Sequence, residues 1–205
     1  MSQSIPAIFI ADSVGLDFLN SVATPVDVPV DWIDNGEGLL AWLDQARLVP
    51  RATLDSIRGR AMPGELDEVA ARSRHLREWF RSFVRRHKGK SLSGAALVEL
   101  DPLNHLLERD EKYQKLAARR APAASPLTLE SLRRWRSPET LLQPIGEALA
   151  TLVATENFAH VKACEGPTCT LLFADHTRGH TRRWCSMEIC GNRAKQAAHR
   201  SRAKH

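Results

Sequence analysis

The sequence lacks the features that mark several large classes of protein. Its longest apolar runs are far too short to cross a membrane, and no charged-then-apolar leader with a cleavage site stands at its start. It also has no Gly-rich phosphate loop, no Walker lysine and no nucleophile elbow. We therefore expect a cytoplasmic protein without the enzymatic activities that depend on these motifs.

Cysteine is scarce and is confined to the last quarter of the chain. The four cysteines form two pairs with the same gap of four residues, and fifteen residues separate the pairs. They are Cys164, Cys169, Cys185 and Cys190. Two such pairs supply the four soft ligands of a closed tetrahedral zinc site, although thiolates alone would also accept iron. Disulfides are disfavoured in a reducing cytosol, and unrelated buried cysteines would not occur as matched pairs. We expect one zinc ion per chain.

The residues between the two pairs have the pattern of a β-hairpin. Residues 171–174 are typical of a short strand, residues 175–180 of a turn around Gly179, and residues 181–184 of a returning strand. This arrangement would bring the second pair of cysteines back to the first. With four thiolates available, His176 and His180 are expected on the hairpin surface rather than as ligands.

A basic segment follows the last cysteine. Its alanine, lysine, arginine and glutamine residues predict a helix over 191–205, but without a large apolar side chain it has no stripe to bury. From Val161 onward there are nine Lys/Arg and three Asp/Glu, whereas the preceding residues hold 20 basic and 21 acidic side chains. This asymmetry indicates a polyanionic partner for the tail. The alternative is a solvated terminal helix tethered by the metal.

The cysteine-rich end resembles the CGNR zinc finger. The resemblance rests on the two cysteine pairs, residues 173–175, residues 182–187 and the run Cys190-Gly191-Asn192-Arg193-Ala194-Lys195. That family joins this finger to an N-terminal helical domain called ABATE, and its members are predicted bacterial transcription regulators. The run Leu16-Asp17-Phe18-Leu19-Asn20 and the domain order resemble ABATE.

Most of the remaining chain has helical periodicity. The clearest helix covers residues 65–88, and a core helix over 138–153 runs almost directly into the cysteine-rich module, so we expect the module to pack on its parent domain. A further helix is predicted over 101–116, whereas residues 127–135 fit either a helix or a hairpin. The side of the 65–88 helix opposite its apolar residues is expected to be solvated. It carries Arg74, Arg77, Arg81, Arg85 and Lys88.

The predicted fold is mostly α. A helical N-terminal domain over 1–160 is followed by a treble-clef-like module over 161–205, which consists of a cysteine knuckle, a β-hairpin and a helix. In the N-terminal domain Asp17 and Asn20 share one face of a predicted helix, beside apolar residues. Such groups need hydrogen-bond partners when buried, and we expect either the loop 24–35 or a small polar ligand to provide them. The resemblance to ABATE implies that the domain has a sensory role. On that view a small polar ligand would complete the hydrogen bonds of Asp17 and Asn20.

The sequence leads to a DNA-binding transcription regulator, without enzymatic activity, as the first hypothesis. Double-stranded DNA would bind the basic module, the helical domain would sense or form a homodimer, and the protein would be associated with the nucleoid. The predicted DNA contacts are Arg178, Arg182, Arg183, Arg193, Lys195, Arg200 and Arg202. One alternative is a zinc module that binds an acidic protein. Another is an HNH-type nuclease using Asp175, His176 and Asn192, which is disfavoured because the cysteines fill a closed site and no second carboxylate–histidine cluster is evident.

Overall fold

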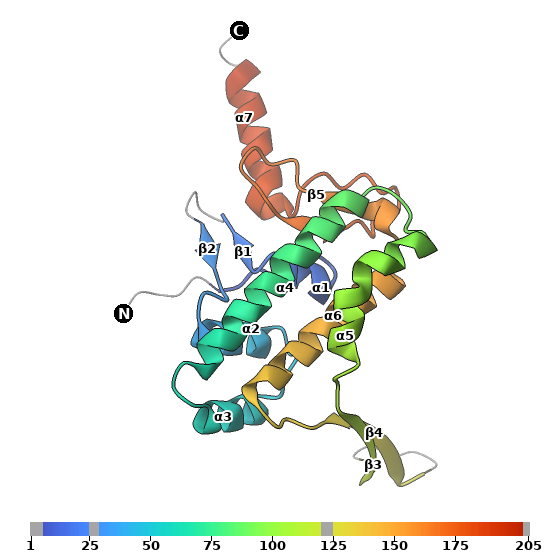
Figure 1. Cartoon of the computed structure of the whole chain (residues 1–205). Helices are drawn as coiled ribbons and strands as arrows, with labels where there is room; N and C mark the ends of the chain where they lie inside the picture. The colour runs from blue at the N-terminus through green and yellow to red at the C-terminus, as the bar shows by residue number, and fades with distance from the viewer. Residues whose placement is uncertain (1–5, 25–28, 120–124, 203–205) are drawn as a thin grey trace.

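Two long helices, α4 and α6, form the centre of the fold, and the short helix α1 packs against both (Figure 1). The computed structural model describes residues 6–24, 29–119 and 125–202. α4 spans Glu65–His87, α6 spans Leu142–Thr155 and α1 spans Val14–Leu19. The apolar spacing that predicted α4 and α6 places their apolar sides in one common core, so both predictions are confirmed. Gly15 allows the close approach of α1 to α6, because a Cβ there would lie 2.8 Å from the Ala148 carbonyl oxygen.

Helices α2 and α3 cover one end of this core. α2 (Gly36–Gln45) begins at Asn35, whose side chain accepts a hydrogen bond from the Gly38 N–H (2.9 Å) and so caps the helix. α3 spans Arg51–Arg60. Trp42 of α2 is buried between the rings of Phe9 and Phe18, which connects the N-terminal segment to the core.

The middle of the chain differs from its prediction. After η1 (Gly94–Leu100), the helix expected over 101–116 ends early, as α5 (Asp101–Leu107). The chain then forms strand β3 (Lys112–Ala118), which pairs antiparallel with β4 (Leu127–Arg133). The undecided segment 127–135 is therefore largely a strand. The pairing of β3 with β4 determines both the early end of the predicted helix and the strand over 127–133. The local spacing of apolar residues does not reveal such pairing.

Part of the arginine row on α4 is buried, so the expectation of a solvated face is wrong for Arg77 and Arg81. The guanidinium of Arg77 donates to Asp31 (2.7 and 2.8 Å) and to the Ser21 hydroxyl (2.9 Å). Arg81 donates to the carbonyl of Leu19. These partners lie at the end of α1 and in the small sheet of β1 (Val22–Ala23) and β2 (Val30–Asp31), which covers this side of α4.

The cysteine-rich segment and the β3–β4 ribbon lie at opposite ends of the molecule (Figure 1). Between the ribbon and the cysteines come η2 (Pro138–Leu141), α6 and η3 (Phe158–His160). The cysteine-rich segment contains β5 (Val161–Ala163), β6 (Leu172–Ala174), the short π-helix η4 (Met187–Gly191) and α7 (Asn192–Arg202). In the part of the chain that the structure describes, no helix has both the length and the hydropathy needed to span a membrane.

Candidate metal centre

The two cysteine pairs meet in space as their spacing predicted. The sulfur atoms of Cys164, Cys169, Cys185 and Cys190 all lie within 4.8 Å of one another, and Cys169 alone of the four is half-buried rather than buried. The first pair lies on a tight turn that requires glycine. A Cβ on Gly166 would lie 2.9 Å from the Cys169 Cβ and 3.1 Å from the Cys190 Sγ, so a larger residue would disturb the sulfur cluster.

The electrostatics of this cluster favour a bound cation. The hydrogen bond between the Cys169 and Cys185 sulfurs lowers the pKa of Cys169 to about 5. The same contact with Cys169, together with burial, raises the pKa of Cys185 far above its ordinary value, and burial raises that of Cys190. The thiols of Cys185 and Cys190 therefore resist deprotonation beside the other sulfurs. A divalent metal ion would remove this mutual repulsion and release the protons.

Backbone geometry connects the second cysteine pair to α7. The Ser186 hydroxyl accepts a hydrogen bond from the Ile189 N–H (2.9 Å) and begins η4. The buried Gly191 closes η4 against the side chains of Met187 and Trp184, and α7 begins at the next residue. A metal ion held by the four sulfurs would therefore fix the base of α7.

The predicted hairpin between the cysteine pairs is wrong in its pairing. β6 forms as expected, but its partner is β5, with Val161 opposite Ala174. Residues 181–184 are not a strand. They are held by side chains instead, because the Lys162 ammonium donates to the carbonyls of His180 and Arg182. A three-residue strand carries too little pattern to identify its partner.

Asp175 is a buried centre of these contacts. Its carboxylate accepts from Lys162 (2.7 Å), from the N–H and hydroxyl of Thr177, and from the N–H of Arg182 (2.9 Å). Burial alone would raise the pKa of this carboxyl, but these hydrogen bonds, with Lys162 first, lower it below its ordinary value. The Asp175 carboxylate therefore stabilises the loop that contains Thr177 and Arg182. His176 pairs with Glu156 (2.8 Å). Neither arrangement supports the nuclease alternative.

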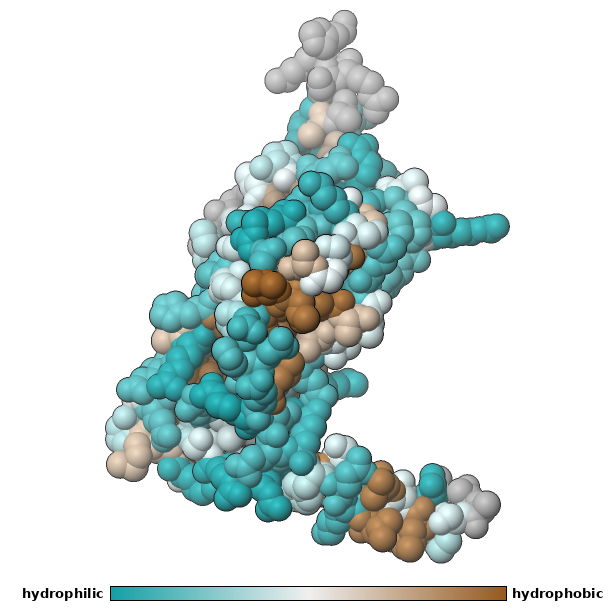
Figure 2. All heavy atoms as spheres, turned by 45° about the vertical axis from the view of Figure 1, so that its right-hand side comes forward, coloured by the Kyte–Doolittle hydropathy of each residue, from teal (hydrophilic) through white to brown (hydrophobic). Residues whose placement is uncertain are grey.

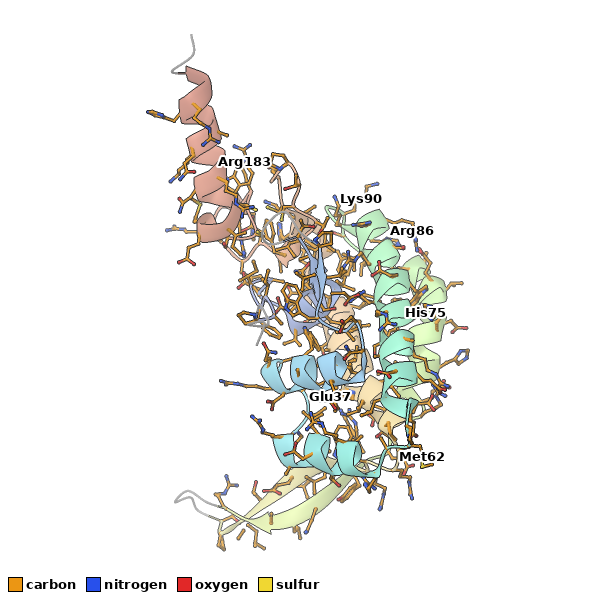
Figure 3. The ribbon with its side chains drawn as sticks, turned by 90° about the vertical axis from the view of Figure 1, so that its left-hand side faces the viewer. Glu37, Met62, His75, Arg86, Lys90 and Arg183 are labelled. Carbon is orange, nitrogen blue, oxygen red and sulfur yellow. The ribbon has the colours of Figure 1, made fainter. Side chains whose placement is uncertain are left out.

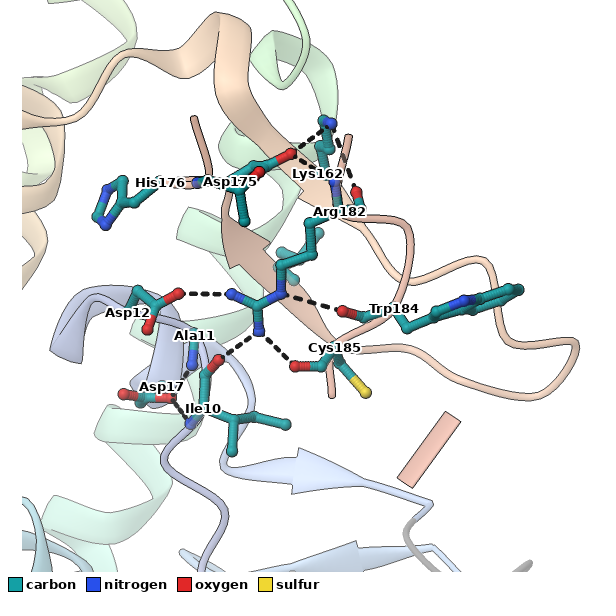
Figure 4. Close-up of polar contacts among 12 residues, drawn as sticks. Ile10, Ala11, Asp12, Asp17, Lys162, Asp175, His176, Arg182, Trp184 and Cys185 are labelled. Carbon is teal, nitrogen blue, oxygen red and sulfur yellow. Dashed lines mark hydrogen bonds and ion pairs between the residues drawn. The ribbon is translucent and has the colours of Figure 1, made fainter. Parts of the chain in front are cut away.

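Arg182 connects the loop to the N-terminal segment (Figure 4). Its guanidinium donates to the carbonyls of Ile10 (2.9 Å), Trp184 (3.0 Å) and Cys185, and it pairs with Asp12. It also lies 4.3 Å above the ring centroid of Phe173. Arg182 is among the predicted DNA contacts, but its donors are used within the chain, so a structural role fits it better.

Asn20 forms the second connection, and its partner differs from the one expected. Its side-chain amide donates to the Leu172 carbonyl (2.8 Å) and accepts from the Leu172 N–H (2.9 Å), as a neighbouring strand would. Asp17 accepts from the N–H groups of Ile10 and Ala11 (3.0 Å each), and burial raises its pKa to about 6. Asn20 is thus bonded to the cysteine-rich segment and Asp17 to the N-terminal segment, where the loop 24–35 was the expected partner. Both side chains thus have partners within the chain, which fits a structural role, and the ligand role of Asp17 and Asn20 stays a prediction.

The other predicted DNA contacts are exposed wherever their side chains are described. Arg178 lies on the turn, and Arg183 makes an exposed ion pair with Glu165 (2.6 Å). Arg193, Lys195 and Arg200 lie on α7, whose side chains point outward around the helix (Figure 3). The side chain of Arg202 and residues 203–205 at the end of the predicted helix lie outside the described residues.

Comparison with known families agrees with this geometry. A family model described as "CGNR zinc finger" matches residues 160–203. A second, ABATE, described as "Putative stress-induced transcription regulator", matches residues 12–156. No curated protein matches the chain. The zinc-finger match and the four clustered sulfurs together support one Zn²⁺ per chain as the cofactor.

Proposed function

Because this chain belongs to the ABATE family and ends in a CGNR zinc finger, we propose that it is a zinc-dependent DNA-binding transcription regulator. In this proposal residues 161–205 bind duplex DNA, and residues 1–160 form the regulatory domain that controls or pairs the binding modules. The protein would then act at the nucleoid. The four cysteines would hold the zinc ion, which replaces the hydrophobic core that so small a module lacks.

The observation that carries the proposal is the exposed, basic α7, which extends away from the body of the protein (Figure 1). At 100° per residue, Arg193 and Arg200 share one side of the helix, and Lys195 and His199 lie on roughly the opposite side. A helix in the major groove has a phosphate backbone on either side of it, so cations on both sides fit this position. The small side chains of Ala194 and Ala197 would allow close approach.

The metal would give α7 a defined direction. The described part of α7 has no apolar stripe that could dock it on the body, and its base is the segment from Cys185 to Gly191 around the sulfur cluster. Zinc would therefore convert a flexible basic tail into a helix at a fixed angle to the regulatory domain. This is the property that separates a DNA-reading element from a simple polycation.

The test is a fluorescence-anisotropy titration of duplex DNA at several salt concentrations, with zinc-loaded full-length protein. Removal of residues 191–205 deletes five of the nine Lys/Arg that follow Val161, so affinity should fall sharply and the salt slope should flatten. Arg85→Ala combined with Arg86→Ala on α4 is the control that removes cations elsewhere. Equal DNA binding by the shortened and full chains would contradict the proposal, and binding of only an acidic protein would favour the alternative zinc module.

A further inference from the structure

The β3–β4 ribbon is the second element that projects from the body, at the end opposite α7 (Figure 1). Its base is firmly held. Arg133 pairs with Asp110 (2.6 Å) and Glu147 (2.9 Å), and Lys112 also pairs with Glu147. Beyond this base the two strands extend into solvent. Figure 2 shows apolar residues gathered on the projecting arm.

The exposed leucines of the ribbon share one face. Leu116 is opposite Leu129 and Ala118 is opposite Leu127, and pairs two apart in register point to the same side of a ribbon. The exposed fractions are 66% for Leu116, 61% for Leu129 and 50% for Leu127. We name Leu116, Ala118, Leu127 and Leu129 the leucine face.

A ribbon of this kind is an unusual surface for a protein that works alone. Two isolated antiparallel strands are only marginally stable in water, and they need a covering layer to gain stability. Here the apolar side chains that would serve such a layer are turned outward, although the other side of the ribbon is more polar. Such a patch on a projecting element indicates an interaction surface.

The charges of the ribbon point to a second copy of the chain as the covering partner. Next to the leucine face lie the uncharged Gln114 and Ser131, and the cations at the base are paired with Asp110 and Glu147. On the opposite face Lys115 stands directly across from Glu130. The nearest cation beyond β3, Arg119, donates to the Leu127 carbonyl (3.4 Å).

A two-fold axis places identical surfaces against each other, so it tolerates only a surface that does not repel itself. The leucine face meets this condition, whereas a nucleic acid would require unpaired cations there. We propose that the leucine face is a self-association surface, through which two chains form a dimer with both α7 helices free. This inference goes beyond the DNA-binding proposal and stands without it.

The size of the face sets the expected strength. Three partly exposed leucines and an alanine offer on the order of 300 Å² per chain, less than the roughly 800 Å² per partner of a standard interface. We therefore expect reversible association with a dissociation constant on the order of 10 µM rather than a permanent dimer.

The experiment is sedimentation equilibrium on the zinc-loaded full chain without DNA, from about 1 to about 200 µM, a range that brackets the expected constant. Leu129→Lys and Leu116→Lys each place a charge at the proposed interface in both copies, and either should weaken association about tenfold or more. The matched control is Val98→Lys on η1, because Val98 is 82% exposed and lies outside the ribbon. It should leave the constant unchanged within about twofold. Zinc content and melting temperature confirm that each variant is folded.

Three results would overturn the proposal. A wild-type chain that stays monomeric over the whole range has no self-association surface of this strength. Association that survives both leucine substitutions lies on another surface. A Val98→Lys variant as weak as Leu129→Lys would show that the effect is a general response to added charge. The predicted pattern, in which the leucine variants alone dissociate, supports the proposal whatever the outcome of the DNA titration.

Discussion

The zinc-finger segment has two parts, residues 161–191 with β5 and β6 (the β5–β6 part) and α7, and they differ in how they use basic residues. In the β5–β6 part Arg178 and Arg183 are exposed, but Lys162 and Arg182 turn inward and hold buried carboxylate and carbonyl groups. On α7, Arg193, Lys195 and Arg200 are exposed. Positive charge thus stabilises the fold at Lys162 and Arg182 and remains at the surface on α7. A count of basic residues indicates that the module suits a polyanionic partner. Only the contacts within the chain show which of these residues are used to stabilise the fold.

The attachment of the two parts to the body differs in the same way. β6 lies in the common core, where Phe173 and Ala174 are fully buried, and it is bonded to Asn20 of the N-terminal region. The expectation that the module packs on its parent domain is confirmed by these contacts. α7 packs on η4, which carries Cys190, so we expect its position to depend on the sulfur cluster.

Removal of the metal should have the largest effect. Structural zinc contributes on the order of 10–16 kcal/mol to the folding of small metal modules, so a chelator or Cys185→Ser should abolish the order of α7 and of the two cysteine turns. An independent finger would leave the rest of the protein intact. Here we expect partial loss of amide protection in β6 and α1 as well, because Asn20 and Arg182 bond the two regions. Hydrogen exchange with and without chelator measures this, and unchanged α1 protection would show that the finger is a separate unit.

Asn20→Ala should have the next largest effect. The substitution leaves the buried N–H and carbonyl of Leu172 without their side-chain partners, which costs on the order of 2–5 kcal/mol of unfolding free energy. Chemical denaturation measures the loss. Asn35→Ala, which removes only a helix cap, is the matched control and should cost about 1 kcal/mol. Equal effects of the two variants would mean that the Asn20 connection contributes no more than a surface cap.

The sequence predicted what depends on local pattern and missed what depends on distant partners. Cysteine spacing is enough to predict the sulfur cluster, and apolar periodicity is enough to predict α4 and α6. The partner of Asn20 is 152 residues away, and nothing in either segment indicates the contact. The burial of Arg77 likewise depends on where the β1–β2 sheet lies. The only sequence signal for the structural role of Arg182 is that it stands close to Cys185, which was expected to be buried at the metal site.

The pH dependence of stability should reveal Asp17. Burial raises its folded pKa to about 6, above the ordinary value of 3.8. The group therefore contributes stability that is fully present below pH 3.8 and is lost as the pH rises through about 6. Asp17→Asn keeps an oxygen for the Ile10 and Ala11 N–H groups without the buried charge. Relative to wild type, the variant should gain on the order of 1–3 kcal/mol between pH 4 and 7. If the unfolding free energies of wild type and Asp17→Asn changed with pH in parallel over this range, the raised pKa would be contradicted.

The smallest effect on stability is expected from Arg200→Ala, and its comparison with Arg182→Ala separates the two parts of the finger most directly. Arg200 is exposed on α7, so its loss should change the free energy of unfolding by less than about 0.5 kcal/mol. If it contacts a phosphate, the slope of log affinity against log salt should fall by about one. Arg182→Ala should have the opposite pattern of effects. It removes hydrogen bonds to Ile10 and Trp184, so the free energy of unfolding should fall by about 1–3 kcal/mol, while the DNA affinity of the folded protein stays near wild type. Thermal melts and salt titrations of both variants check this. If Arg182→Ala flattened the salt slope while Arg200→Ala left it unchanged, the DNA surface would lie on the loop beside the N-terminal segment, because a cation that contacts phosphate must contribute to counterion release wherever it stands in the fold.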